Sequence, residues 1–121
     1  MEQNVHSIRF YNELVADVIS ARRGIERLKG DARRILSLME TTPQYFRFAQ
    51  LEESGLPPLG HCSIVYPMAE EWPTAEGFQR AFVEWHAAGS RLTTAWQMLS
   101  PEDQRVLWGA NPANAGAPIL R

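Results

Sequence analysis

The sequence predicts an all-α protein, a small helical bundle built on two long antiparallel helices at about 7–40 and 74–99. In both segments apolar residues recur at alternating steps of three and four, which places them along one helix face. Prolines are concentrated in residues 43–73, and proline interrupts regular elements, so a Pro-rich irregular connector is expected between the helices. A chain of 121 residues has room for one domain, which we expect over 1–108.

The first predicted helix carries an apolar seam through residues 11–39. Its composition favours helix, and no proline occurs before Pro43. Gly30 followed by Asp31 is typical of a helix stop and restart, but the apolar phase passes through Gly30 unshifted. We therefore expect one continuous helix, about 50 Å long. The seam residues are Tyr11, Leu14, Val18, Ala21, Ile25, Leu28, Ala32, Ile35 and Met39.

The connector is expected to contain one short helix and one extended loop. Thr42 and Pro43 are typical of a helix start, so a short helix is predicted from Pro43 to about Ser54. Later prolines exclude a long regular element, and residues 61–66 are expected to be extended. Connectors of this length are often functional or packed by their own aromatic residues.

The second predicted helix begins after Thr74, which is a suitable N-cap. Its seam is bulky, whereas the first seam contains small residues such as Ala21 and Ala32, and facing helices interdigitate in this way. The two helices are therefore expected to pack antiparallel, within one chain or between chains. The second seam consists of Phe78, Phe82, Trp85, Gly89, Leu92, Trp96 and Leu99.

A third, short helix is expected after Ser100. Ser100 is an N-cap residue, Pro101 occupies the first helical position, and Glu102 and Asp103 place acids in the first turn. Residues 109–121 are small, Pro-rich and poor in apolar anchors. The sequence predicts a flexible C-terminal tail there.

Composition restricts the function classes. A formal net charge of −2 is too near neutral to indicate nucleic acid or a membrane surface by itself. The single cysteine, Cys62, cannot form an internal disulfide and no signal peptide is recognisable, so a cytoplasmic location is expected. No apolar stretch approaches the roughly 20 residues of a membrane span, so no membrane partner is expected. Eleven of the twelve basic residues are arginine, which favours a bacterial or phage source.

No residue pattern indicates an enzyme, and no cofactor or metal is expected. His61 and Cys62 are adjacent, so on an extended segment they point to opposite faces, and no second ligand pair accompanies them. Glu84 and His86 lie two apart on a predicted helix and also face apart. The sequence contains no Gly-rich phosphate loop and no nucleophile elbow.

Two groups of residues are candidates for partner binding. The first is a basic cluster within residues 22–34, which suits phosphates or an acidic protein surface but is also typical of the solvated flank of an amphipathic helix. The second is Trp72 and Trp108, which lie outside the seams, because exposed tryptophans often anchor partners. The candidate arginines are Arg22, Arg23, Arg27, Arg33 and Arg34.

These observations favour a small cytoplasmic protein–protein interaction module, an adaptor, inhibitor or regulatory subunit that acts as a homodimer. Its expected partners are another protein, a second copy of itself, or both. One alternative is a nucleic-acid-associated regulator that uses the basic helix flank 22–34, with salt-sensitive binding. Another is a small-ligand-binding or enzymatic helical domain that uses the aromatic seam of helix 74–99.

Overall fold

The structure is a computed structural model that describes residues 2–44, 46–49 and 66–119, with the backbone alone for residues 2–5. The described chain is all-α, which confirms the predicted fold class. Its elements, in order, are α1 (Glu2–Thr41), the 3-10 turn η1 (Ala69–Glu71), α2 (Ala75–Met98), α3 (Pro101–Val106), the 3-10 turn η2 (Trp108–Ala110) and α4 (Pro112–Ala115).

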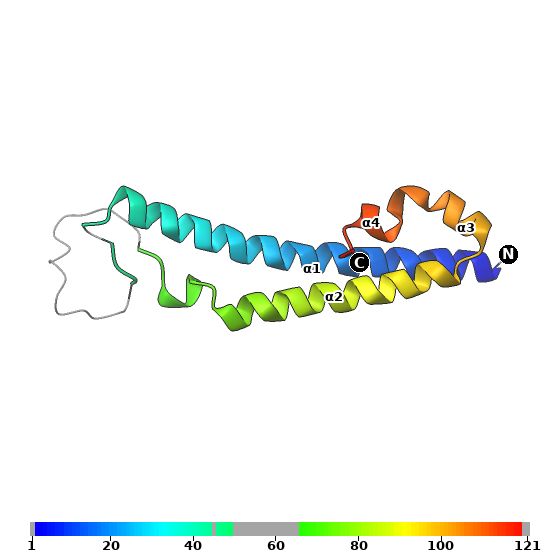
Figure 1. The fold of residues 1–121 in the computed structure, drawn as a ribbon, viewed down its shortest axis with the longest axis horizontal. Coiled ribbons are helices and arrows are strands. Elements are labelled where there is room, and N and C mark those ends of the chain that lie inside the picture. Colours follow the sequence, from blue (N-terminus) through cyan, green and yellow to red (C-terminus); the bar gives the residue numbers. More distant parts are fainter. Residues whose placement is uncertain (1, 45, 50–65, 120–121) are drawn as a thin grey trace.

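The long helices α1 and α2 lie side by side and antiparallel, as predicted (Figure 1). α1 passes through Gly24 and Gly30 without a break, so the prediction of one continuous helix is confirmed. At 1.5 Å per residue its 40 residues span about 60 Å, against about 36 Å for the 24 residues of α2. The protein is therefore an elongated helical hairpin (Figure 1).

The predicted seams form the contact between the two helices. All nine seam residues of α1 are buried or partly buried, and Ile25 is only 6% exposed. In α2, Gly89 and Leu92 are buried, and most of the other seam residues are partly buried. Phe82 is the exception at 41% exposed, with its ring edge-on to Trp85 at 6.1 Å. Burial of these apolar faces is what holds the hairpin closed.

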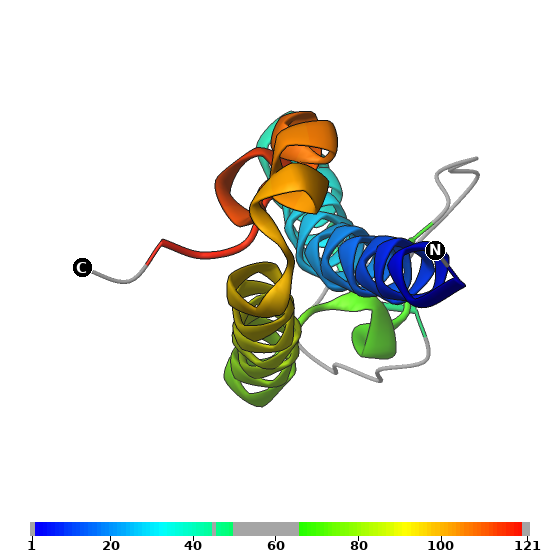
Figure 2. The same ribbon diagram turned by 90° about the vertical axis from the view of Figure 1, so that its right-hand side faces the viewer.

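The C-terminal elements fold back against the hairpin (Figure 2). Ser100 caps α3 as predicted, since its hydroxyl accepts a hydrogen bond from the Asp103 amide at 3.2 Å. Beyond residue 108 the chain continues to pack: Ala117 is only 7% exposed and belongs to the main apolar cluster. The flexibility predicted for residues 109–121 stays a prediction, but the described part of that segment extends the helical domain beyond residue 108.

The short helix predicted from Pro43 is wrong for the described residues up to Ala49. The Thr42 hydroxyl donates to the Leu38 carbonyl at 2.9 Å, so Thr42 closes α1 instead of opening a new helix. Pro43 begins a turn, and the Ala49 amide donates to Pro67 at 2.7 Å. Residues 50–65, which contain the rest of that predicted helix together with His61 and Cys62 of the predicted extended piece, lie outside the described residues.

Two glycines are expected to respond oppositely to alanine. A Cβ at Gly30 meets nothing within 4 Å, so Gly30→Ala should raise the free energy of unfolding by about 1 kcal/mol through helix propensity. A Cβ at Gly89 would lie 2.5 Å from Pro118 Cδ, so Gly89→Ala should lower it by about 1–3 kcal/mol through overpacking. Urea unfolding followed by circular dichroism measures both. Changes of the same sign would contradict the packing of Pro118 on α2.

A buried phenol predicts a loss of stability at high pH. Tyr11 is fully buried and donates to the Ala110 carbonyl at 2.5 Å, and desolvation raises its pKa from 10.0 to about 12. The folded chain therefore favours the neutral phenol, whose full contribution is present below pH 10 and is lost as the pH rises towards about 12. We expect this loss to reach about 2–3 kcal/mol in urea unfolding. The Tyr11→Phe variant should lack that part of the decline, and an equal decline in both proteins would contradict it.

Candidate functional site

The clearest candidate site is a groove between α1 and α2, which we call the α1–α2 groove. Its apolar end, about 360 Å³, is lined by Phe10, Leu14, Ser90, Arg91, Thr94, Ala95 and Met98. Its charged end, about 370 Å³, is lined by Asp17, Ser20, Ala21, Gly24, Glu84, Ala88 and Arg91. Arg91 lines both ends, so the two hollows are neighbours along the α1–α2 pair.

The charged end of the groove lies on the side of the hairpin away from the C-terminal elements. On α1, Arg22 faces the C-terminal segment, and Asp17 and Gly24 lie about 140–160° round the helix from it. On α2, Gly89 packs against Pro118, and Glu84 and Arg91 are offset from it by the same angles, about 140–160°. Figure 2 shows α3 and α4 on one side of the α1–α2 pair. The described helices therefore leave the charged end open, whereas Ser90 and Thr94 of the apolar end also line a hollow beside Pro118.

The apolar end of the groove exposes large side chains to solvent. Phe10 is 57% exposed and Met98 is 82% exposed, and both line the groove together with the buried Leu14. Burying one such side chain fully contributes about 1.5–3 kcal/mol. Apolar patches with a polar rim are typical of surfaces that bind other proteins.

The charged end of the groove offers side chains that the hairpin itself does not neutralise. Asp17, Glu84 and Arg91 are all exposed. The ion pairs within the described part of the chain lie elsewhere, Lys29 with Glu26 at 3.1 Å and Arg34 with Glu71 at 2.9 Å. One guanidinium and two carboxylates are thus available to a partner.

Two of the five candidate arginines serve the fold. The Arg22 guanidinium lies 5.6 Å from the centre of the Trp85 ring, and its Nη1 is 3.5 Å from the Gly116 carbonyl oxygen. Arg34 donates to one carboxylate oxygen of Glu71, and the other oxygen accepts from the Met68 amide at 2.6 Å. These contacts attach the C-terminal segment and η1 to α1.

The other candidate arginines, Arg23, Arg27 and Arg33, are exposed. At 100° per residue, Arg23 and Arg27 lie about 40° apart, but Arg33 lies about 120° from Arg27. The structure therefore spreads the basic cluster around α1 and does not gather it into one strip.

The candidate tryptophans are exposed but far apart. Trp72 follows η1 at one end of the hairpin, and Trp108 begins η2 towards the other end (Figure 1). The Trp108 ring also contacts the Trp96 ring, with centroids 6.1 Å apart. The structure does not bring the two residues into one site.

The aromatic seam of α2 is largely core. Trp85 Nε1 donates to the Gly116 carbonyl at 2.8 Å, and the Trp96 ring lies 5.6 Å from Tyr11. The chain's own side chains and backbone therefore occupy the surroundings of both tryptophans, which leaves the predicted ligand groove of the seam without support.

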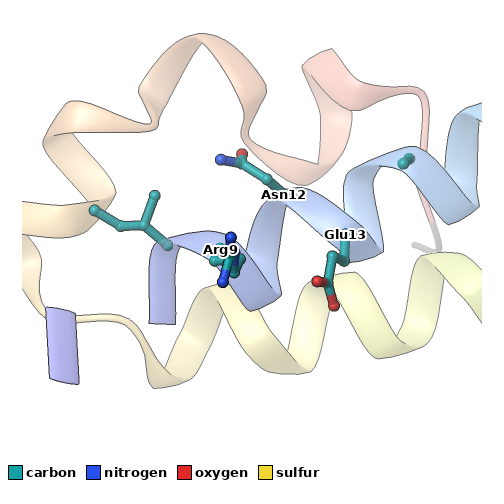
Figure 3. Close-up of a pocket in the computed structure, with 5 residues that line it drawn as sticks. Arg9, Asn12 and Glu13 are labelled. Carbon is teal, nitrogen blue, oxygen red and sulfur yellow. The ribbon is translucent and has the colours of Figure 1, made fainter. Parts of the chain in front are cut away.

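A second hollow lies on α1 alone. It measures about 600 Å³ and is lined by Ile8, Arg9, Asn12, Glu13 and Ala16. In Figure 3, Asn12 and Glu13 point to different sides of the helix. All its lining residues come from about two turns of one helix, so the hollow does not gather side chains from different elements.

Three further observations concern metal binding, membrane-spanning helices and similarity to known proteins. Within the described residues, no group of three or more His, Cys, Asp or Glu side chains is placed to hold a metal ion. Among the helices described, none combines the length and the apolar character needed to cross a membrane. The chain matches no protein-family model, no curated protein and no solved structure.

The groove residues were missed by the sequence-based candidates. Glu84 and Arg91 are seven residues apart, with Gly77 and Met98 a further seven on either side, so these four form a second stripe on α2. This period was present in the sequence. It was hidden because its members are of mixed polarity, and only the structure shows which flank of α2 the other elements leave open.

Proposed function

We propose that this chain is a protein–protein interaction module that acts as a homodimer, with the α1–α2 groove as its interaction surface. The observation that carries this proposal is the apolar end of the groove, which the exposed Phe10 and Met98 line together with the buried Leu14. Large exposed apolar side chains that line one groove are typical of a surface that binds another protein.

The shape of the hairpin supports the same function. α1 is about 60 Å long, whereas a compact globule of this chain length has a diameter of about 35 Å. The C-terminal elements cover only one side of the hairpin (Figure 2). A partner could cover the other side of the hairpin, as the C-terminal elements cover the first.

Sedimentation velocity at micromolar concentration tests the proposal. We expect a species of twice the chain mass of 13.7 kDa, and Met98→Asp should shift it towards monomer because a charge would enter the apolar end of the groove. Ile119→Asp is the matched control, since Ile119 is also exposed but lies outside the groove. A monomer at every concentration, or equal effects of the two substitutions, would contradict this function.

A further inference from the structure

The α1–α2 groove has the charge pattern of a surface that can bind its own copy. Glu84 and Arg91 carry opposite charges, lie on one face of α2 and both line the groove. When two copies of α2 are laid antiparallel about a twofold axis midway between these residues, each Arg91 faces the partner's Glu84. This arrangement repeats the same contact twice, as a twofold interface requires.

We propose that the occupant of the groove is a second copy of this chain, with α2 antiparallel to its partner about an axis beside Ala87 and Ala88; this rests on the proposed function. The exposed Ala87 presents only a methyl group at the axis, and its neighbour Ala88 is buried in the core of the hairpin. Small residues at a helix crossing let the two backbones approach closely.

The same register matches large residues with small ones at the ends of the contact. Met98, which is largely exposed, then faces the partner's Gly77. Phe10 lines the same end of the groove as Met98. One arrangement therefore places a partner residue opposite Met98 at the apolar end and opposite Glu84 and Arg91 at the charged end.

Asp17 strengthens the charge argument. It lines the charged end beside Glu84 and Arg91, so the partner's guanidinium enters between two carboxylates from different helices. A guanidinium can donate to both, and close charge pairs across an interface fix its register.

The contact is large enough for a stable dimer. Overlap over residues 77–98 of α2 is about 33 Å long. With α1 alongside and each helix about 10 Å wide, the footprint is about 660 Å² per chain, or about 1,300 Å² in total. Stable interfaces bury about 1,200–2,000 Å².

Charge reversal of the full chain tests the register. In sedimentation equilibrium, Glu84→Arg and Arg91→Glu should each raise the dimer Kd about tenfold or more, because two like-charge contacts replace two ion pairs. The double variant should restore the Kd to within about threefold of the original value. Arg23→Glu, an exposed reversal on α1 outside the groove, should leave the Kd unchanged.

A cross-link gives an independent readout of the axis. In a Cys62→Ser background, Ala87→Cys should form a disulfide-linked dimer on mild oxidation, since the axis passes beside this position. Thr93→Cys is the matched control, because Thr93 is exposed on α2 about 180° round the helix from Glu84. It should stay uncross-linked.

The outcomes distinguish failure of this register from failure of the homodimer itself. A dimer that is insensitive to both charge reversals, or that cross-links through position 93 and not 87, overturns this register and leaves the homodimer intact. A monomeric wild-type chain overturns both. Rescue by the double variant together with cross-linking at position 87 supports the antiparallel α2 interface.

Discussion

Ile25→Asp is expected to lower the free energy of unfolding by about 3 kcal/mol or more. Ile25 lies at the middle of the α1 seam and is 6% exposed, so the substitution places an unpaired carboxylate in the helix contact. Because small domains are stable by only about 5–15 kcal/mol, this is a large share of the total. Urea unfolding at neutral pH measures the loss, which should shrink at acidic pH as the carboxylate is protonated.

Arg33→Asp is the control for Ile25→Asp. Arg33 is exposed on the same helix, so this change should stay within about 0.5 kcal/mol. Similar losses in the two variants would mean that the inward and outward faces of α1 are wrongly assigned.

Removal of residues 112–121 is expected to destabilise the chain by about 3 kcal/mol or more. The truncation deletes Ala117 from the apolar cluster and leaves Trp85 Nε1 without its acceptor, the Gly116 carbonyl. Loss of this hydrogen bond costs about 0.5–1.5 kcal/mol, and the re-exposed apolar surface around Leu92 adds to this. Thermal and urea unfolding of the truncated and full chains measure the difference.

A shorter truncation distinguishes the effect of lost packing from the effect of shortening the chain. Removal of residues 119–121 deletes the exposed Ile119 but keeps Ala117 and Pro118, so it should change stability by less than about 0.5 kcal/mol. If the longer truncation is equally harmless, the segment does not contribute to the core, and the sequence-based interpretation of a flexible tail holds.

The two seams could be predicted because their physics is local. A helix repeats every 3.6 residues, so spacing alone showed that Leu14, Ile25 and Ile35 share a buried face. Continuity through Gly30 followed from the same phase. The helix N-caps at Thr74 and Ser100 could also be predicted, because each hydroxyl oxygen accepts a hydrogen bond from the backbone amide three residues later.

The packing of the C-terminal segment could not be predicted from the sequence, because it depends on contacts with residues that are distant in the chain. Residues 111–116 contain their own signals, with Asn111 as N-cap and Gly116 ending the turn at φ 95°. Yet a turn this short is stable only where it packs. The hydrogen bonds from Tyr11 to the Ala110 carbonyl and from Trp85 to the Gly116 carbonyl join residues far apart in the chain. No local sequence pattern predicts them.

By itself, the sequence determined the all-α class, the two long helices and the faces on which they meet, since these follow from helical period and capping chemistry. Only the tertiary structure decided which arginines are engaged and which flank of the hairpin stays open. Arg22 and Arg34 are indistinguishable in sequence from Arg23 and Arg27, and they differ only because Gly116 and Glu71 fold back beside them. The C-terminal segment packs on one side of α1 and α2, whereas Glu84 and Arg91 stay exposed and line the groove between the two helices.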